Sequence, residues 1–159
     1  MKPKVYVETT VVSYLTARPS RDIVTLAHQH ITHEWWRSAA SRFNLVTSEL
    51  VRVEASAGDP AAARSRLDAL AQVAIIEATA EAAALAEELL DLGALPRQAS
   101  QDAAHVAIAV SNSIDYLVTW NLRHIANVIA RTAIERACRR AGYRPPAICT
   151  PEELLEIVE

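Results

Sequence analysis

The chain has 159 residues, of which 51% are hydrophobic and 22% are charged. This length and composition predict one domain, residues 1–159, with a single buried core. Sixteen Lys and Arg against nineteen Asp and Glu leave a net charge of -3 at pH 7, so any contact with nucleic acid must be a local patch. The three glycines, Gly58, Gly93 and Gly142, lie too far apart for the glycine-rich phosphate loops of Rossmann and P-loop proteins.

Cysteine usage and hydropathy indicate the compartment. Cys138 and Cys149 show neither CxxC spacing nor a second pair, which fits reduced thiols better than a disulfide framework. No stretch approaches the roughly 18 to 20 apolar residues of a membrane span, and the first ten residues lack the apolar region of a signal peptide. We therefore expect a cytoplasmic protein.

Short apolar runs alternate with longer amphipathic segments along the whole chain. Strands are expected at 4–7, 43–47, 73–76, 115–121 and 146–149. Helices are expected at 11–15, 21–42, 48–56, 61–70, 79–92, 101–112 and 125–141, with Ser100 as a helix cap and a last capped helix from Pro151. This alternation predicts an open, mainly parallel sheet with helices on both faces, and a functional site beyond the carboxyl ends of the strands.

Four polar residues lie at or near the ends of the expected strands or open a helix: Glu8, Glu54, Asp102 and Asn121. Brought together, they form an oxygen-rich pocket of the kind that Mg²⁺ or Mn²⁺ prefers. Three carboxylates stay ionised at close range only if a cation compensates them, and such a cation suits phosphodiester hydrolysis.

Four segments carry a family resemblance: VETTVVSYL, SELVRVEASAGDP, QDAAHVAIAV and IDYLVTWNLRHI. Their order and spacing resemble PIN-domain proteins, in particular VapC-type ribonuclease toxins, over nearly the whole chain. The resemblance implies a three-layer α/β/α PIN-like domain and a metal-dependent endoribonuclease, the toxin of a toxin–antitoxin pair. The implied partners are an RNA substrate, a second copy in a homodimer and an antitoxin protein that blocks the site.

The resemblance also assigns roles to single residues. Glu54 and Asp102 match the family's motifs, whereas Glu8 and Asn121 stand where the family usually has Asp. Glu8, Asp102 and Asn121 would hold Mg²⁺ or Mn²⁺, and Glu54 would position the metal or a water. Supporting contacts are expected from Thr9, Thr119 and His105. Because Asn121 has lost one negative charge, weaker metal binding is expected than at an all-carboxylate site.

Each residue also has a structural explanation. Asn121 is a good helix cap, and Asp102 in a first helical turn is favoured by the helix dipole. Glu49 competes with Glu54, since five residues of helix place them about 140° apart and only one faces the site. Asp115, at the opposite end of its strand about 20 Å away, is not expected to replace the missing carboxylate.

Two further clusters have competing interpretations. His28, His30 and His33 resemble a metal motif, but His28 and His30 face opposite sides of a helix, so a surface helix is expected. Arginines concentrate late in the chain, and the candidates for RNA contact are Arg123, Arg131, Arg136, Arg139 and Arg140. The competing interpretation is a solvated helix face that balances the acidic stretch from Glu77 to Asp91.

Two other functional classes stay open. A PIN-like domain with metal binding weakened by Glu8 and Asn121 would serve as an RNA- or protein-binding module without cleavage. A phosphoacceptor receiver domain would need a lysine after a late strand, and the two lysines of this chain are Lys2 and Lys4.

Overall fold

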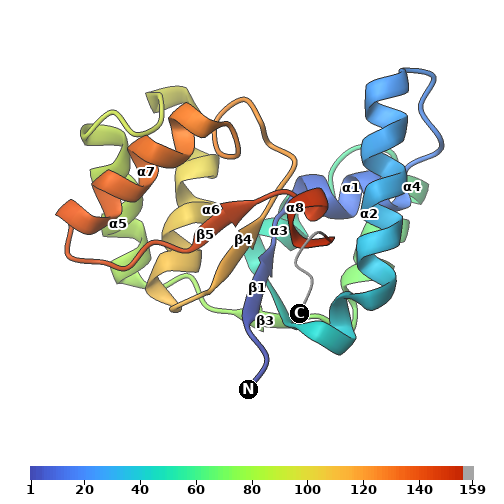
Figure 1. Ribbon diagram of the computed structural model, residues 1–159, viewed down its shortest axis with the longest axis horizontal. Helices are drawn as coiled ribbons and strands as arrows, with labels where there is room; N and C mark the ends of the chain where they lie inside the picture. The colour runs from blue at the N-terminus through green and yellow to red at the C-terminus, as the bar shows by residue number, and fades with distance from the viewer. Residues whose placement is uncertain (156–159) are drawn as a thin grey trace.

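The computed structural model describes residues 1–155, and its central strand is β1 (Lys4–Val7). The other strands are β2 (Asn44–Ser48), β3 (Ala74–Ile76), β4 (Tyr116–Val118) and β5 (Ala147–Cys149). They form one parallel sheet in the order β3-β2-β1-β4-β5 (Figure 1). The predicted α/β fold with a mainly parallel sheet is confirmed.

The strand order changes direction at β1. The chain builds the sheet outward through β2 and β3, then returns to the other side of β1 with β4 and β5. In open α/β sheets such a switch point opens a crevice at the carboxyl ends of the strands. Here the carboxyl ends of β1 and β4 meet where Glu8 follows β1 and Thr119 follows β4, and the amide of Glu8 donates to the carbonyl of Val118 at 3.2 Å.

Eight α-helices connect or follow these strands within residues 1–155. They are α1 (Thr9–Thr16), α2 (Ile23–Arg42), α3 (Glu49–Ala55), α4 (Pro60–Leu70), α5 (Ala80–Asp91), α6 (Ser100–Ser111), α7 (Val128–Arg140) and α8 (Pro151–Leu155). A 3-10 turn, Arg97–Ala99, leads into α6. The end of the predicted last helix, beyond Leu155, lies outside the described residues.

The structure corrects several predicted boundaries, and the strand expected at 115–121 spans only Tyr116–Val118. Ser100 is the first residue of α6 and does not cap it; Ala99 occupies the cap position without a side-chain hydrogen bond. The predicted helix from 125 begins only at Val128, because Asn127 caps it by accepting from the amide of Ala130 at 2.9 Å.

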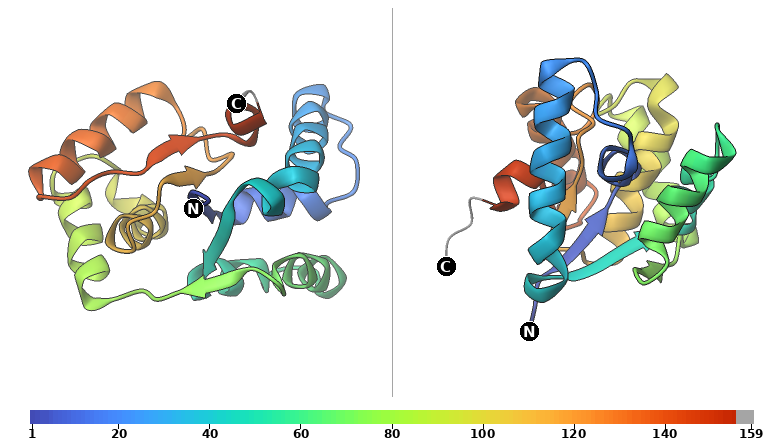
Figure 2. Two further views of the ribbon diagram at one scale, coloured as in Figure 1. Left: turned by 60° about the horizontal axis from the view of Figure 1, so that its bottom comes forward. Right: turned by 90° about the vertical axis from the view of Figure 1, so that its right-hand side faces the viewer.

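Alternate side chains of the strands enter two separate cores, as the pleat of a strand dictates. Tyr6 and Leu117 pack on the side of α5, α6 and α7. Val5 and Val7 pack with Trp35 of α2 on the other side, so helices cover both faces of the sheet (Figure 2). Trp36, next to the buried Trp35, is only partly buried. Within residues 1–155, no helix has the length and apolarity needed to cross a bilayer.

Candidate functional site at the carboxyl edge of the sheet

Glu8 is a buried carboxylate at the junction of β1 and α1. It has extended backbone geometry and caps α1, because its Oε2 accepts from the amide of Thr10 at 3.1 Å. Its Oε1 accepts from the hydroxyl of Thr10 at 2.6 Å and from the hydroxyl of Thr119. Only 3% of Glu8 is exposed. These donors offset the cost of taking a carboxylate out of water.

Thr10 and Thr119 also connect the ends of β1 and β4. Thr10 Oγ1 accepts from the amide of Trp120 at 2.8 Å, and Thr119 Oγ1 accepts from the amide of Asn121 at 2.9 Å. Thr119 thus contacts Glu8 as a supporting residue would. Thr10 was missing from the predicted site, because helix-cap rules predict the bond from its amide to Glu8 and not the bonds of its hydroxyl.

Glu54 approaches the same edge from α3. Its Oε1 lies 2.7 Å from Nε2 of His105 on α6 and accepts the hydroxyl of Thr9. Burial raises the pKa of Glu54, but the hydrogen bonds that it accepts from His105 and Thr9 outweigh burial and hold that pKa below its usual value. Glu54 is therefore ionised at neutral pH.

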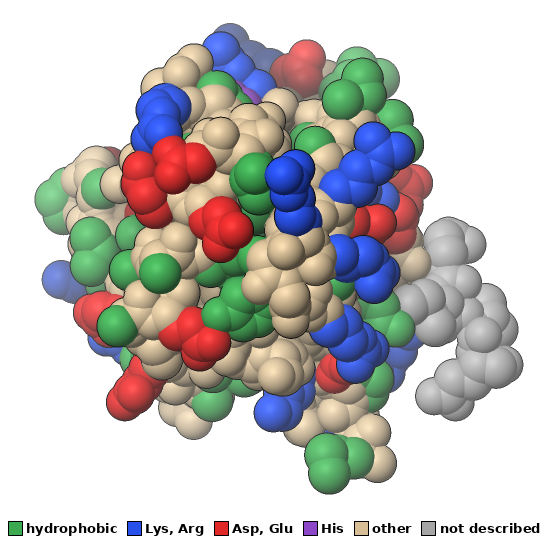
Figure 3. All heavy atoms as spheres, turned by 90° about the vertical axis from the view of Figure 1, so that its left-hand side faces the viewer, with side chains coloured by type: hydrophobic (Ala, Val, Ile, Leu, Met, Phe, Trp, Pro, Cys, Tyr) green, Lys and Arg blue, Asp and Glu red, His purple; other side chains and the backbone are tan. Residues whose placement is uncertain are grey.

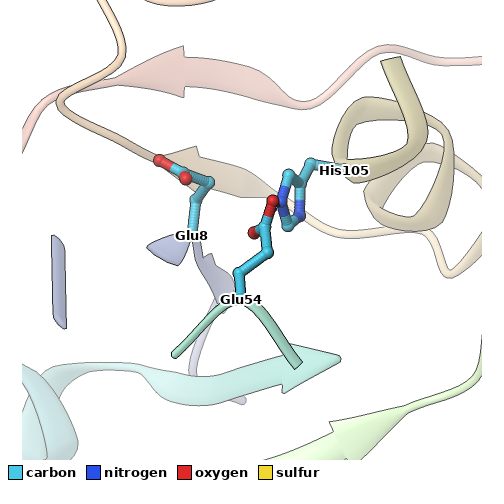
Figure 4. Close-up of side chains that lie close together, drawn as sticks. All are labelled: Glu8, Glu54 and His105. Atoms are coloured by element: carbon cyan, nitrogen blue, oxygen red, sulfur yellow. Dashed lines mark hydrogen bonds and ion pairs between the residues drawn. The ribbon is translucent and has the colours of Figure 1, made fainter. Parts of the chain in front are cut away.

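Glu8, Glu54 and His105 converge, with one ligand atom from each lying within 4.8 Å of the others (Figure 4). Three segments far apart in sequence supply them: the end of β1, the helix after β2, and α6. Two carboxylates at this range favour a bound cation, and carboxylate oxygens are the ligands of Mg²⁺ and Mn²⁺. The donor set fits such an ion.

Asp102 does not belong to this 4.8 Å group, and Asn121 is linked to the site through its amide, which donates to Thr119 Oγ1. Asp102 Oδ2 lies 2.8 Å from Nδ1 of His124, and Asn121 Oδ1 accepts from the amide of His124 at 3.0 Å. Asp102 precedes His105 by three residues on α6, so the two side chains share one helix face. Metal binding by Asp102 and Asn121 stays a prediction.

The competing carboxylates lie elsewhere. The side chain of Glu49 is 72% exposed and 3.8 Å from Arg52, so Glu54 is the glutamate of α3 that faces the cluster. Asp115 accepts from the amide of Lys4 at 2.8 Å, at the amino end of the sheet as predicted. His28 stacks on Trp120 with a centroid separation of 4.0 Å.

The predicted RNA-contacting arginines divide into two groups. Arg131 is engaged, because two of its nitrogens lie 2.6 and 2.9 Å from the carboxylate of Glu153. No ion pair within residues 1–155 involves the four others, which are exposed: Arg123, Arg136, Arg139 and Arg140.

On the face around α7 most acidic side chains gather on the left and most basic side chains on the right, with some of each sign among the other (Figure 3). Arg136 and Arg140 line a hollow of about 240 Å³ between α7 and Leu92–Ala94, the segment after α5. Arg139 lines a second hollow of about 650 Å³ at the amino end of the sheet. The basic side chains therefore extend along α7 away from the acidic cluster, and RNA contact by them stays a prediction.

No family model and no curated protein matches this sequence. Among solved structures, the chain is similar to one in the crystal structure of VapBC2 from Rickettsia felis bound to a DNA fragment from their promoter. The two chains are 15% identical and superpose with a TM-score of 0.59 over 92% of this chain and 98% of the other. At this identity the likeness shows the fold, a helix-flanked parallel sheet consistent with a PIN-like domain.

Proposed function

We propose that this protein is a metal-dependent endoribonuclease whose site is the acidic cluster at the carboxyl edge of the sheet. The observation that carries the proposal is the convergence of Glu8, Glu54 and His105 at the switch point of a PIN-like fold. The VapBC2 likeness supports the fold, and the cluster supports the chemistry.

Glu8 and Glu54 are the residues that would hold Mg²⁺ or Mn²⁺. When bound, the ion would polarise the phosphate and lower the pKa of a water molecule. The chain's own residues prepare the site: Thr10 and Thr119 orient Glu8, while Thr9 and His105 orient Glu54. We assign to Asp102 and Asn121 the outer part of the same site, next to His124.

The proposal extends to partners. VapBC2, the structural neighbour, is a complex bound to promoter DNA. We propose that this chain likewise acts as the toxin of a toxin–antitoxin pair, forms a homodimer, and is blocked by an antitoxin protein in the cytoplasm. Gel filtration with light scattering tests the homodimer directly, because a monomer at micromolar concentration would contradict it.

The decisive experiment is cleavage of a panel of structured RNAs with Mg²⁺, with Mn²⁺ and with EDTA. Asp102→Asn is assayed beside Asp115→Asn, the same change at the opposite end of the sheet. We expect metal-dependent products from the wild type and from Asp115→Asn, and none from Asp102→Asn or in EDTA. Products that persist in EDTA would contradict the proposal.

A second function rests on Asn121, whose side-chain oxygen is used by the amide of His124 and which supplies no charge. This favours a PIN-like module that binds RNA or protein without cleaving. RNA binding by a folded protein that yields no metal-dependent products would support it. Asn121→Asp would then be the first variant to test for restored cleavage.

A further inference from the structure

Two buried hydroxyls support His105 from the side opposite Glu54. Tyr6 Oη lies 2.7 Å from Nδ1 of His105 and 2.7 Å from Oγ of Ser48. Tyr6, Ser48 and His105 are each 0% exposed. They come from β1, from the last residue of β2 and from α6, so the fold itself assembles this row of groups.

The hydroxyl hydrogens of Ser48 and Tyr6 can be placed by asking which acceptor is available to each of them. Ser48 Oγ already accepts from the amide of Val51 at 3.3 Å, and within residues 1–155 the acceptor available to its hydrogen is Tyr6 Oη. The Tyr6 hydrogen then points at Nδ1 of His105. When Ser48 donates to Tyr6 and Tyr6 donates to His105, every one of these donors has an acceptor.

The order in which these groups donate also decides which ring nitrogen of His105 carries the proton. Nδ1 accepts from Tyr6, so the proton of the neutral ring is on Nε2 and points at Oε1 of Glu54. Oε1 also accepts from Thr9, whereas Oε2 of Glu54 has no hydrogen-bond partner within residues 1–155. The other oxygen of Glu54 is therefore left for a ligand.

We propose that Ser48 and Tyr6 are positioning residues that hold His105 as an Nε2–H donor, so that His105 orients Glu54 and is not itself a metal ligand. This inference rests on the proposed metal site. It assigns the ion to carboxylate oxygens alone, since an Nε2 that carries a proton has no lone pair for a metal.

The alternative arrangement makes Nε2 of His105 a ligand. Its proton would then move to Nδ1, Tyr6 would have to accept there and donate to Ser48, and the Ser48 hydrogen would lose its acceptor. A buried hydroxyl hydrogen without a partner costs free energy. The two arrangements differ in the tautomer of one histidine, which can be measured.

The first measurement is the ¹H–¹⁵N NMR spectrum of the His105 ring, recorded without metal and with saturating Mg²⁺. We expect the protonated nitrogen to be Nε2 in both spectra. A proton on Nδ1 after addition of Mg²⁺ would overturn the proposal. This readout does not depend on cleavage, so it decides the role of His105 even if the protein cuts no RNA and the proposed nuclease function fails.

The second measurement compares Tyr6→Phe with Tyr116→Phe, the same change at the amino end of β4. Loss of groups that orient a metal-binding site typically costs 10- to 100-fold in affinity or activity. We expect Tyr6→Phe to raise the Mg²⁺ concentration for half-maximal cleavage at least about 10-fold with KM for RNA unchanged, and Tyr116→Phe to match the wild type. An unchanged Mg²⁺ requirement in folded Tyr6→Phe would contradict the positioning role.

The NMR spectrum of Tyr6→Phe distinguishes a raised Mg²⁺ requirement caused by the lost hydrogen bond from one caused by misfolding. Tyr6→Phe keeps the ring in the core and removes only the donor to Nδ1. In a variant with wild-type circular dichroism we expect the Nδ1 resonance of His105 to shift, because this nitrogen loses its donor while Nε2 keeps its proton on Glu54. A spectrum with both ring nitrogens unchanged would show that Tyr6 does not bond Nδ1.

Discussion

The hydroxyl of Thr10 donates to Oε1 of Glu8 at 2.6 Å, across the first turn of α1. The same oxygen of Thr10 accepts from the amide of Trp120 at 2.8 Å. One side chain therefore holds the buried carboxylate and ties the end of β4 to the start of α1. This relationship makes Thr10 important for stability as well as for the geometry of the site.

Thr10→Val keeps the shape of the side chain and removes both bonds. We expect a loss of about 1–3 kcal/mol in the free energy of unfolding, because a buried carboxylate and a backbone amide each lose a partner. Urea unfolding measures this loss. The control is Thr25→Val, whose hydroxyl bonds Asp22 on the exposed start of α2 and which should change stability by less than about 0.5 kcal/mol. Equal losses in both variants would contradict the role given to Thr10.

The two glutamates of α3 give a matched test of the site. Glu54→Gln removes the charge that faces Glu8 and His105, whereas Glu49→Gln changes an exposed side chain. We expect metal-dependent RNA cleavage to fall at least about 10-fold in Glu54→Gln and to stay at the wild-type rate in Glu49→Gln. Equal rates in the two variants, measured under single-turnover conditions, would remove Glu54 from the site.

The Arg131–Glu153 pair predicts a pH dependence of stability. The hydrogen bond from Arg131 is the main cause that lowers the pKa of Glu153. A carboxyl group with a lowered folded pKa stabilises the fold above its unfolded pKa of about 4.3, and this contribution is lost as the pH falls through the folded value. Because the side chain of Glu153 is 48% exposed, we expect Glu153→Gln to cost less than about 1 kcal/mol at pH 7.

Urea unfolding of Glu153→Gln between pH 3 and 7 tests this dependence, with the pH limits set about the unfolded pKa of roughly 4.3. The difference from the wild type should be largest at pH 7 and should shrink toward the acid end. Glu152→Gln, at the neighbouring exposed residue, is the control for removing one carboxylate from the same helix. If the difference in free energy of unfolding between the wild type and Glu153→Gln grew as the pH fell, the ion pair would be contradicted.

Both cysteines are buried free thiols, in agreement with the predicted absence of a disulfide framework. Burial raises the pKa of Cys138 to about 11 and that of Cys149 to about 12. Since the thiolate is the nucleophile, we expect neither residue to react with iodoacetamide in the native protein at pH 8, and both to react in urea. Mass spectrometry counts the adducts, and rapid native modification would contradict this burial.

The exposed arginines of α7 predict a salt effect on RNA binding. Each phosphate contact contributes about 0.7 to the slope of log K against log salt for a single strand. The double variant Arg136→Gln, Arg140→Gln should therefore flatten the slope by about 1.4. The same change at Arg37 and Arg64, on α2 and α4, keeps the net charge equal and should leave the slope unchanged. Parallel slopes for both double variants would favour a solvated helix face.

Local sequence patterns were sufficient for much of the fold. Short β-prone apolar runs and helix-period segments predicted the alternating elements, and their alternation predicted a mainly parallel sheet with helices on both faces. Ser100 was wrongly predicted as a cap because a 3-10 turn, closed by the bond from the amide of Ala99 to the carbonyl of Pro96, precedes the helix and moves its start to Ser100 itself.

The sequence by itself determined the strands, the helices and the presence of Glu8 and Glu54 near the carboxyl edge, because short-range periodicity and strand-end position encode these. Only the tertiary structure decided that His105 faces Glu54 and that Tyr6 supports His105, since those contacts join residues 51 and 99 positions apart. No local pattern specifies which nitrogen of a buried ring meets which oxygen. That choice depends on how three elements pack and on where every buried hydrogen finds an acceptor.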